Sequence, residues 1–369
     1  MIIGTVRELK SNESRVGLTP DAVRCYVDDG HTVLVESGAG KNSLFPDTDY
    51  EAMGAQIVDN AAEVWQRCEM MVKVKEPVRE EFQYFREDLI LFTYLHLAAN
   101  AELTQALIDA NVTAIAYETV VGPSGKDLPL LAPMSYVAGR LSIQEGANCL
   151  KATNGGAGKL LGGVPGTEAS EIVIIGGGAV GTQAAQMAVG TDARVTILES
   201  NPERILELSS MFQTSLQVIQ STPATIETWL QRADLVISCV LIPGAKAPQL
   251  IRREHLPLMK KGSVIVDVAI DQGGSTEMSR PTTHDQPTFI EDGVVMYCVA
   301  NMPGAVPQTS TIALNNATMA YGLAIAQLGL HGATEKFPGL KHGVNVYRGA
   351  VTHQGVADAT GHECIELQL

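Results

Sequence analysis

Residues 171–199 constrain the fold of this chain more than any other stretch. Residues 172–175 form a short β-branched run, as in a strand buried on both faces, and three glycines follow in G-x-G-x-x-G spacing. Gly176 allows a tight turn, Gly178 lets the backbone approach a pyrophosphate, and Gly181 lets the next helix pack close to the sheet. A second apolar run then ends in an acid. Since strand, glycines, helix, strand and acid occur in this order, we predict a dinucleotide-binding unit rather than an ordinary glycine turn.

The acid that closes this stretch indicates which dinucleotide is bound. Glu199 follows the second predicted strand, at residues 195–198, and is placed to bond the hydroxyls of a ribose. A carboxylate there repels a 2′-phosphate, so we predict NAD rather than NADP. Arg204 leaves an alternative open, because an arginine at that position can accept a phosphate or can simply lie on a helix surface. A methyltransferase fold places its glycines and acid similarly, but a G-x-G-x-x-G that opens a helix favours the dinucleotide.

Short apolar runs alternate with helix-like segments along the chain, which is typical of mostly parallel sheets covered by helices. The predicted strands are residues 2–6, 32–35, 70–74, 89–95, 113–117, 172–175, 195–198, 217–219, 234–240, 263–268 and 294–299, the last being the final strand expected. The predicted fold class is therefore α/β, with two doubly wound, Rossmann-like parallel sheets, a cleft between them and long helices that join them.

Two segments suggest how the chain is divided into domains. Residues 122–131 are rich in turn formers and mark a boundary. Residues 310–328 are apolar on most sides, so this predicted helix must be buried by other elements. The remaining residues are too few for a core of their own and are expected to pack back on the first domain. We therefore expect a discontinuous substrate domain, 1–131 with 307–369, and an NAD-binding domain, 132–306.

Chemically useful side chains follow several predicted strands of the first sheet. In an open α/β sheet, ligands bind beyond the carboxyl ends of the strands. Arg15, Lys75, His96 and Glu118 all follow such ends. Each also has a simpler interpretation, as a surface loop residue, a solvated ion-pair partner or a hydrogen-bonded structural residue. Lys73 and Lys75 share one strand face, so the sequence does not choose between them, although the proline just beyond favours Lys75 as the one outside the sheet.

The second sheet ends in a similar way. Asp271 follows the strand predicted at 263–268, and Asn301 follows the strand at 294–299. Both therefore lie at the carboxyl edge that holds the cofactor. An acid at this position is either a loop cap or a functional group, and the position alone does not decide between them.

Composition and cysteine usage narrow the class of protein. A net charge of −15 argues against nucleic acid or an anionic membrane as a partner, since both select basic surfaces. The six cysteines are far apart and form no C-x-x-C pair, as in a reduced compartment. The apolar run at the start is too short for a signal peptide, and no run approaches the length of a membrane span. We expect a cytoplasmic protein without a metal.

Many longer stretches together resemble the alanine dehydrogenase family, from Ile2 to about Gly355. They are RE at 7–8, ESRV at 13–16, VKVKEP at 72–77, YLHLA at 94–98, AYET at 116–119, LAPMS at 131–135, GVPG at 163–166, VLIPGAKAP at 240–248, DVAIDQGG at 267–274 and VANMP at 299–303. So many ungapped matches are far more specific than any single motif.

The resemblance implies a reaction and the residues that perform it. The family oxidatively deaminates L-alanine to pyruvate and ammonia with NAD, and runs the reverse reaction. Matching positions imply that Arg15 and Lys75 bind the substrate and that His96 and Asp271 are the acid–base pair. Because Asp271 belongs to the other domain, the resemblance implies a site completed when the cleft closes.

The resemblance also implies the cofactor contacts and the assembly. The expected cofactor-binding residues are Ser135, Gly176, Gly178, Ala179, Val180, Gly181, Glu199, Arg204, Leu241, Asn301 and Met302. The family often has Asp where this chain has Glu199, a longer acid that can make the same bonds. A homohexamer is implied. The NAD-binding subunit of a proton-translocating transhydrogenase shares the fold, but it would need membrane partners and would not turn over alanine. A non-catalytic NAD-binding regulator would need no acid–base pair.

Overall fold

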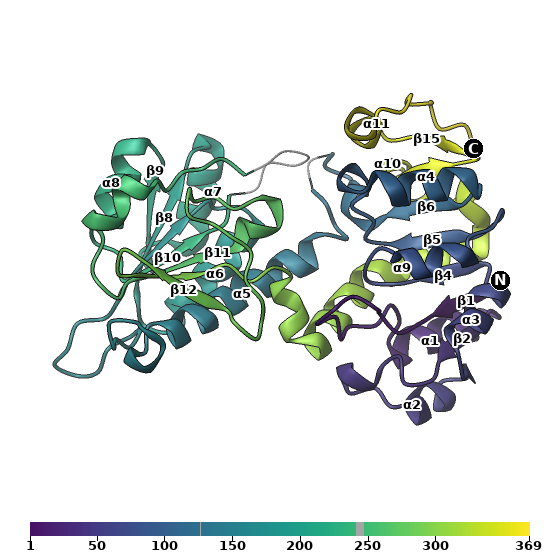
Figure 1. Ribbon diagram of the computed structural model, residues 1–369, viewed down its shortest axis with the longest axis horizontal. Coiled ribbons are helices and arrows are strands. Elements are labelled where there is room, and N and C mark those ends of the chain that lie inside the picture. The colour runs from purple at the N-terminus through teal and green to yellow at the C-terminus, as the bar shows by residue number, and fades with distance from the viewer. Residues whose placement is uncertain (126, 241–246) are drawn as a thin grey trace. The chain divides into compact units, whose positions relative to one another are not determined.

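The computed structural model describes residues 1–125, 127–240 and 247–369. The chain forms two compact units, one of Met1–Met134 with Val306–Leu369 and one of Ser135–Ala305 (Figure 1). Each unit is built on one sheet with helices on both faces. The predicted α/β class with two mostly parallel sheets is confirmed. No helix in the described residues is long and apolar enough to cross a membrane, and all six cysteines are free thiols.

The first sheet has the strand order β15-β14-β6-β5-β4-β1-β2-β3. Its strands are β1 (Ile2–Thr5), β2 (Thr32–Glu36), β3 (Gln56–Val58), β4 (Met70–Val72), β5 (Ile90–Thr93), β6 (Thr113–Ala116), β14 (Val344–Tyr347) and β15 (Ala350–Val351). The strands from β1 to β6 are all parallel, and their direction of winding reverses between β1 and β4. In doubly wound folds the crevice at such a reversal is where ligands bind.

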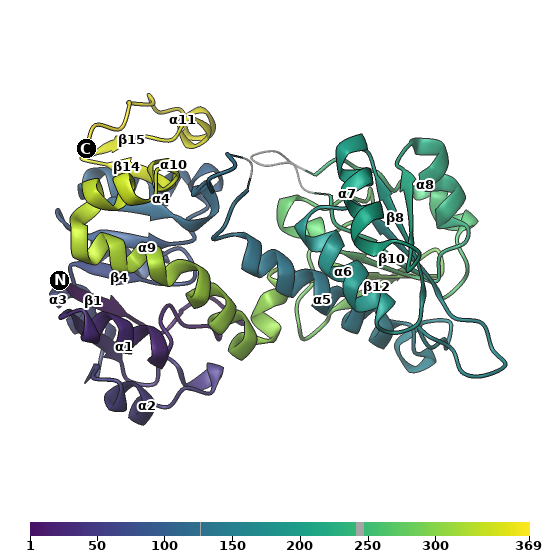
Figure 2. The same cartoon turned by 180° about the vertical axis from the view of Figure 1, so that it is seen from behind.

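Helices cover both faces of the first sheet. They are α1 (Pro20–Asp28), α2 (Asp47–Ala52), α3 (Ala61–Arg67), α4 (Ala101–Asp109), α9 (Pro307–Lys336), α10 (Leu340–Gly343) and α11 (Gln354–Thr360). Figure 2 shows α9 and α1 on one face of the sheet. On the other face, Trp65 of α3 and Leu103 of α4 join a core with Met71 and Leu91. The Thr19 side chain caps α1 by accepting the Ala22 N–H at 3.2 Å.

The C-terminal segment differs from the sequence prediction in one respect. We expected no strand after residues 294–299, but β14 and β15 follow, and β14 pairs antiparallel with β6. These short strands extend the first sheet, so the C-terminal segment packs on the first unit. The helix predicted at 310–328 is also longer, because two helices meet at Gly329, whose φ of 67° breaks the helical run within α9.

The second sheet has the order β12-β13-β11-β10-β7-β8-β9. Its strands are β7 (Glu171–Ile175), β8 (Arg194–Glu199), β9 (Gln217–Gln220), β10 (Leu235–Ser238), β11 (Val264–Asp267), β12 (Thr288–Glu291) and β13 (Val294–Tyr297). All are parallel except the edge strand β12. With β7 counted first, the parallel strands follow the order 3-2-1-4-5-6 of dinucleotide-binding folds. The strand that leads into the glycines is thus at the centre of the sheet, where the order reverses.

The helices of the second unit are α5 (Ala132–Cys149), which begins at the end of the first unit, α6 (Ala179–Val189), α7 (Pro202–Phe212) and α8 (Pro223–Leu230). Ile226 of α8 packs with Val173 and Val236 on one face of the sheet. On the other face, Gly146 of α5 lies so close to Leu235 that a Cβ there would be 2.6 Å from a leucine methyl. The glycine therefore permits the close packing of α5 on β10.

Candidate functional site

The turn between β7 and α6 uses each of its three glycines for a different physical reason. Gly176 has a φ of 98°, a conformation that favours glycine. A Cβ on Gly181 would lie 1.9 Å from the carbonyl oxygen of Gly176, so only glycine lets α6 approach the strand. A Cβ on Gly178 would meet no atom within 4 Å. The fold itself therefore does not require glycine at position 178, and a ligand that approaches the backbone would.

The start of α6 is suited to an anion. Gly178 is the N-cap and has no side chain to accept the N–H groups of the first turn, which include those of Ala179 and Val180. Such N–H groups together with the positive end of the helix dipole bind phosphates. The space at Gly178 and the uncapped helix end thus fit a pyrophosphate.

Two charged side chains brace this turn. One carboxylate oxygen of Glu199 accepts the N–H of Gly177 at 2.7 Å, and the other accepts the N–H groups of Ser200 and Asn201 at 2.7 and 2.8 Å. Arg204 donates from Nε to the Gly177 carbonyl at 2.9 Å, and its Nη2 lies 2.8 Å from the Thr182 hydroxyl. Its Nη1 also pairs with Glu207 at 2.6 Å. Arg204 is therefore bonded to the glycine turn rather than lying on an ordinary helix surface.

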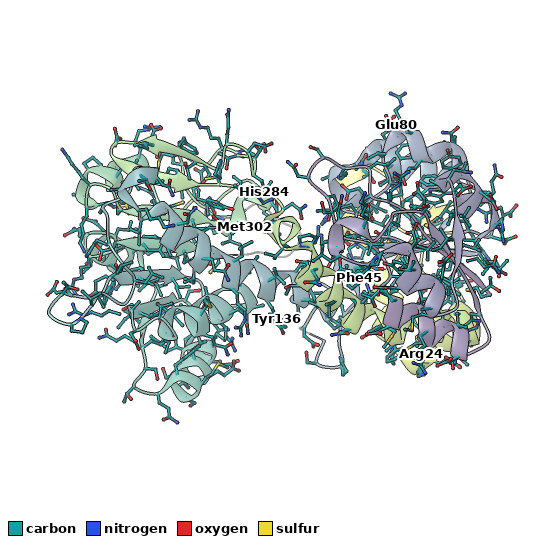
Figure 3. All side chains as sticks on the ribbon, turned by 90° about the horizontal axis from the view of Figure 1, so that it is seen from below. Arg24, Phe45, Glu80, Tyr136, His284 and Met302 are labelled. Carbon is teal, nitrogen blue, oxygen red and sulfur yellow. The ribbon has the colours of Figure 1, made fainter. Side chains whose placement is uncertain are left out.

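Asp271 and Asn301 meet at the same edge of the second sheet. Asp271 lies in a 3-10 turn (Val268–Gln272) directly after β11 and is exposed. Its Oδ1 accepts the backbone N–H of Asn301 at 3.2 Å. Asn301 follows β13 with a left-handed φ of 57°. Met302, labelled in Figure 3, is buried beside it. Ser135 is half-buried in α5, and the predicted cofactor residue Leu241 lies outside the described residues.

In the first unit, Arg15 is buried against a carboxylate. Its Nε and Nη2 donate to the two oxygens of Glu13 at 2.7 and 2.5 Å, and both side chains are almost fully buried. Nη1 lies 2.9 Å from the sulfur of Met134. Burial disfavours the charge of Arg15, but the hydrogen bonds and charge of Glu13 outweigh it and raise the pKa of the guanidinium. Glu13 therefore fixes the orientation of a permanently charged fork.

The structure gives Lys73 and Lys75 different environments. Lys73 is fully buried, with its Nζ 3.1 Å from both Glu8 and Glu81. Lys75 is partly exposed, and its ammonium has no ion pair among the residues that the structure describes. Glu8 also accepts the backbone N–H groups of Val74 and Lys75, at 2.6 and 3.3 Å. Lys73 is thus part of a buried ion cluster, and Lys75 is the amine available at the strand end.

His96 is held in an unusual backbone conformation at the end of β5. Its φ is 49°, and its N–H donates to Glu118 at 2.6 Å. The ring stacks on Tyr94 with centroids 6.0 Å apart and an interplanar angle of 10°. The Nδ1 atom is 4.0 Å from the same Glu118 oxygen, and the side chain is 45% exposed. The imidazole is therefore accessible, while the His96 backbone is anchored by the carboxylate of Glu118, which lies in the turn after β6.

The structure shows that Arg15, Lys75 and His96 leave one edge of the first sheet, after β1, β4 and β5. It also shows supporting residues that sequence reasoning did not assign. Glu13 orients Arg15, and Glu118, noted only as an acid at the edge, holds the backbone before and at His96. The role of Glu13 could have been suspected from the sequence, because this acid lies only two residues before Arg15. The role of Glu118 has no local sequence pattern, because its side chain reaches across to the end of a neighbouring strand.

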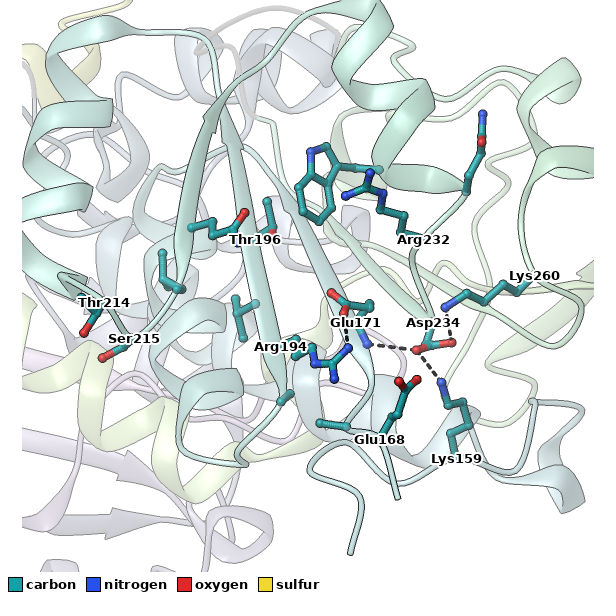
Figure 4. A pocket seen from close by; sticks show the side chains of 17 residues that line it. Lys159, Glu168, Glu171, Arg194, Thr196, Thr214, Ser215, Arg232, Asp234 and Lys260 are labelled. Carbon is teal, nitrogen blue, oxygen red and sulfur yellow. Dashed lines mark hydrogen bonds and ion pairs between the residues drawn. The ribbon is translucent and has the colours of Figure 1, made fainter. Parts of the chain in front are cut away.

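A cavity of about 690 Å³ lies in the second unit, at the amino ends of its strands (Figure 4). Here Asp234, which is buried, binds Lys159 at 2.7 Å, Lys260 at 2.9 Å and the backbone N–H of Glu171 at 2.9 Å. Burial opposes ionisation, but these donors together lower the pKa of Asp234. Because ligands of such sheets bind at the carboxyl ends, this cavity is distinct from the predicted site.

Comparison with known proteins places these features in context. The family model described as alanine dehydrogenase/PNT, N-terminal domain, matches residues 4–138, and the corresponding C-terminal domain matches residues 142–354. Alanine dehydrogenase 2 of Staphylococcus aureus (strain USA300) is 54% identical over 360 residues, which are 97% of this chain and 96% of that protein. Alanine dehydrogenase of Staphylococcus haemolyticus (strain JCSC1435) is 55% identical over 369 residues, 100% of this chain and 98% of that protein.

Solved structures of alanine dehydrogenase and transhydrogenase are also similar to this chain. An L-alanine dehydrogenase structure is similar to this chain with a TM-score of 0.94 and 50% identity, and covers 98% of this chain and 99% of its own. A transhydrogenase from Sinorhizobium meliloti has a TM-score of 0.83 at 24% identity, covering 96% of this chain and 99% of its own. The second likeness is one of fold alone.

Proposed function

We propose the function of this chain from one premise: it belongs to the alanine dehydrogenase/PNT family, whose two domain models together match most of its length. The chain is an NAD-dependent L-alanine dehydrogenase that converts L-alanine to pyruvate and ammonia with formation of NADH, and catalyses the reverse reaction. The observation that carries this proposal is the 55% identity to an alanine dehydrogenase over the whole chain. The substrate domain, 1–131 with 307–369, takes alanine, and the NAD-binding domain, 132–306, takes the cofactor.

The cofactor fits the second unit on physical grounds. The turn at Gly178 leaves space next to the backbone, and the uncapped start of α6 offers N–H groups to a pyrophosphate. Glu199 binds ribose hydroxyls and repels a 2′-phosphate. Arg204 stabilises the glycine turn by donating a hydrogen bond to the carbonyl of Gly177. When bound, NAD accepts the hydride from Cα of alanine. The remaining assigned contacts are Ser135, Gly176, Ala179, Val180, Gly181, Leu241, Asn301 and Met302.

Arg15 and Lys75 bind and polarise the substrate. The guanidinium fork of Arg15, oriented by Glu13, pairs with the substrate carboxylate and so sets the position of Cα. The ammonium of Lys75 donates to a carboxylate or carbonyl oxygen, which polarises the carbonyl carbon of pyruvate for attack by ammonia in the reverse direction.

His96 and Asp271 handle the protons. Loss of hydride from Cα leaves an imine, which water must attack to release ammonia. An imidazole ring nitrogen can accept a proton from that water and return it later in the cycle. The exposed ring of His96 is suited to this exchange, and the carboxylate of Asp271 serves as its acid–base partner.

Spectrophotometry of NADH formation tests the proposal. The purified chain with NAD should form NADH when L-alanine is added at alkaline pH, and should consume NADH only when both pyruvate and ammonia are present. His96→Ala should lose turnover while still binding NADH, measured by fluorescence. Absence of any alanine-dependent signal, with NADH still bound, would defeat the proposal and favour a subunit or regulator that binds NAD without turning over alanine.

The same family membership supports a proposal for the assembly and the location. The chain forms a homohexamer and works in the cytoplasm on small molecules, without nucleic acid or membrane partners. Its net charge of −15 supports the last point. Light scattering of the purified protein checks the hexamer, and a mass of one or two chains would contradict it.

A further inference from the structure

We infer that Asp267 is a positioning residue that fixes the loop on which Asp271 is carried, an inference that rests on the proposed function because Asp271 acts there. Asp267 is the last residue of β11, and its side chain is completely buried. Asp271 lies four positions further on and is exposed. The first residue does not face solvent, so any effect it has on the reaction acts through the loop.

One carboxylate closes this loop at both ends. Oδ1 of Asp267 accepts the N–H of Ala269 at 3.1 Å and the hydroxyl of Ser275 at 2.8 Å. Oδ2 accepts the N–H of Ser275 at 2.8 Å and the hydroxyl of Ser279. The donors thus come from the start of the 3-10 turn that contains Asp271 and from the segment that returns after it. Four hydrogen bonds satisfy the buried carboxylate and restrict the loop between them.

The hydrogen-bonded chain continues to the neighbouring strand. The hydroxyl oxygens of Ser275 and Ser238 are 2.6 Å apart, and Ser238 is the buried last residue of β10. The Ser275 hydroxyl thus lies within donating distance of both the Asp267 carboxylate and the Ser238 hydroxyl. The loop is in this way tied to the ends of two adjacent strands, which are rigid parts of the sheet.

The backbone of the loop is shaped to fit this carboxylate. Gly274 has a left-handed φ of 82°, and a Cβ there would lie 2.3 Å from Cβ of Ser279 and 2.9 Å from Oδ2 of Asp267. The return of the chain past Asp267 therefore depends on the absence of a side chain at position 274. Within the described part of the chain, the Asp271 side chain accepts one hydrogen bond, from the N–H of Asn301 at 3.2 Å, so its own contacts restrain it little. The restraint on its position comes from Asp267 beneath it.

The test is Asp267→Asn, which keeps the volume but replaces one acceptor oxygen by an NH₂ group that faces donors. Residues that orient a metal ligand through a hydrogen bond typically change activity by about 10–100-fold when substituted, and we take that range for the orientation of Asp271. We expect kcat with alanine to fall by that factor, while the KM for NAD and the affinity for NADH change little. The matched control is Asp234→Asn, an equally buried aspartate at the opposite edge of the same sheet, which should lower the unfolding temperature but leave kcat unchanged.

A double-mutant cycle separates positioning from general stability. If Asp267 acts through Asp271, Asp267→Asn should have little further effect on kcat in an Asp271→Asn background. An equal loss in both backgrounds, or a kcat of Asp267→Asn within twofold of the parent, would overturn the inference. If Asp267→Asn does not fold, Ser279→Ala removes one donor and should give a smaller loss with the same dependence on Asp271. A parent chain without alanine-dependent activity is a separate outcome, measured first, that refutes the proposed function itself.

Discussion

Replacing Lys73 by methionine should destabilise the first unit strongly, although the side chain lies outside the proposed chemistry. Its ammonium is 3.1 Å from Glu8 and 3.1 Å from Glu81, and the three side chains are 0%, 1% and 4% exposed. Methionine keeps most of the volume but leaves two buried carboxylates without this cation. Removing one partner of a buried ion pair costs about 3–5 kcal/mol, because the remaining charge is uncompensated.

The size of this loss should depend on pH. Burial raises the pKa of Glu8, and the charge of Lys73 opposes that rise. In Lys73→Met the opposing charge is gone, so the carboxyl takes up a proton on folding over a wider pH range. A folded state that binds more protons than the unfolded state loses stability as pH rises. The variant should therefore be closest to the parent at low pH, near the ordinary glutamate pKa of about 4.3, and furthest from it above the raised pKa.

Urea unfolding followed by circular dichroism at several pH values measures this effect. The control is Lys75→Met, the same substitution two positions along the chain at a partly exposed side chain. It should shift stability by no more than about 0.5 kcal/mol, as surface changes usually do, while abolishing activity with alanine. Equal unfolding midpoints for the two variants would refute the reasoning, and so would a Lys73→Met deficit that does not grow with pH.

Three further predictions concern the cofactor turn and the substrate fork. Gly178→Ala should keep the unfolding midpoint yet raise the KM for NAD by about tenfold or more, equivalent to about 1.4 kcal/mol. Gly181→Ala should instead lose about 1–3 kcal/mol of stability, because its Cβ overpacks the turn. The reverse pattern would contradict the roles assigned to the two glycines. Glu13→Gln should raise the KM for alanine and leave that for NAD unchanged, because Arg15 loses its orienting carboxylate; steady-state kinetics with each substrate varied separately decides this. Glu199→Ser should narrow the preference for NAD over NADP, and comparable activity of the parent with both cofactors would refute the assigned role of this acid.

Local sequence patterns predicted the glycine turn with its flanking strands and the two mostly parallel sheets. The β-branched run, the glycine spacing and the acid at the end of β8 are short-range features, and each is found in the structure where it was expected. The alternation of strands and helices predicted two mostly parallel sheets. Parallel strands bring their carboxyl ends to one edge of the sheet, so the sequence alone placed Arg15, Lys75 and His96, which follow β1, β4 and β5, at the same edge.

Only the tertiary structure distinguishes the roles of similar residues that are close together in the sequence. Lys73 and Lys75 share one strand face in the sequence pattern, and only the approach of Glu8 and Glu81 makes Lys73 a buried ion-pair partner. In the same way, β14 pairs with β6 through a return of the chain that no local pattern shows. Asp267 ends β11 and Asp271 lies four positions beyond it, and the two acids differ because donors from Ser275 and Ser279 converge on the first. Periodicity and turn chemistry act between near neighbours, whereas burial and hydrogen-bond partners arise from segments that meet only when the chain has folded.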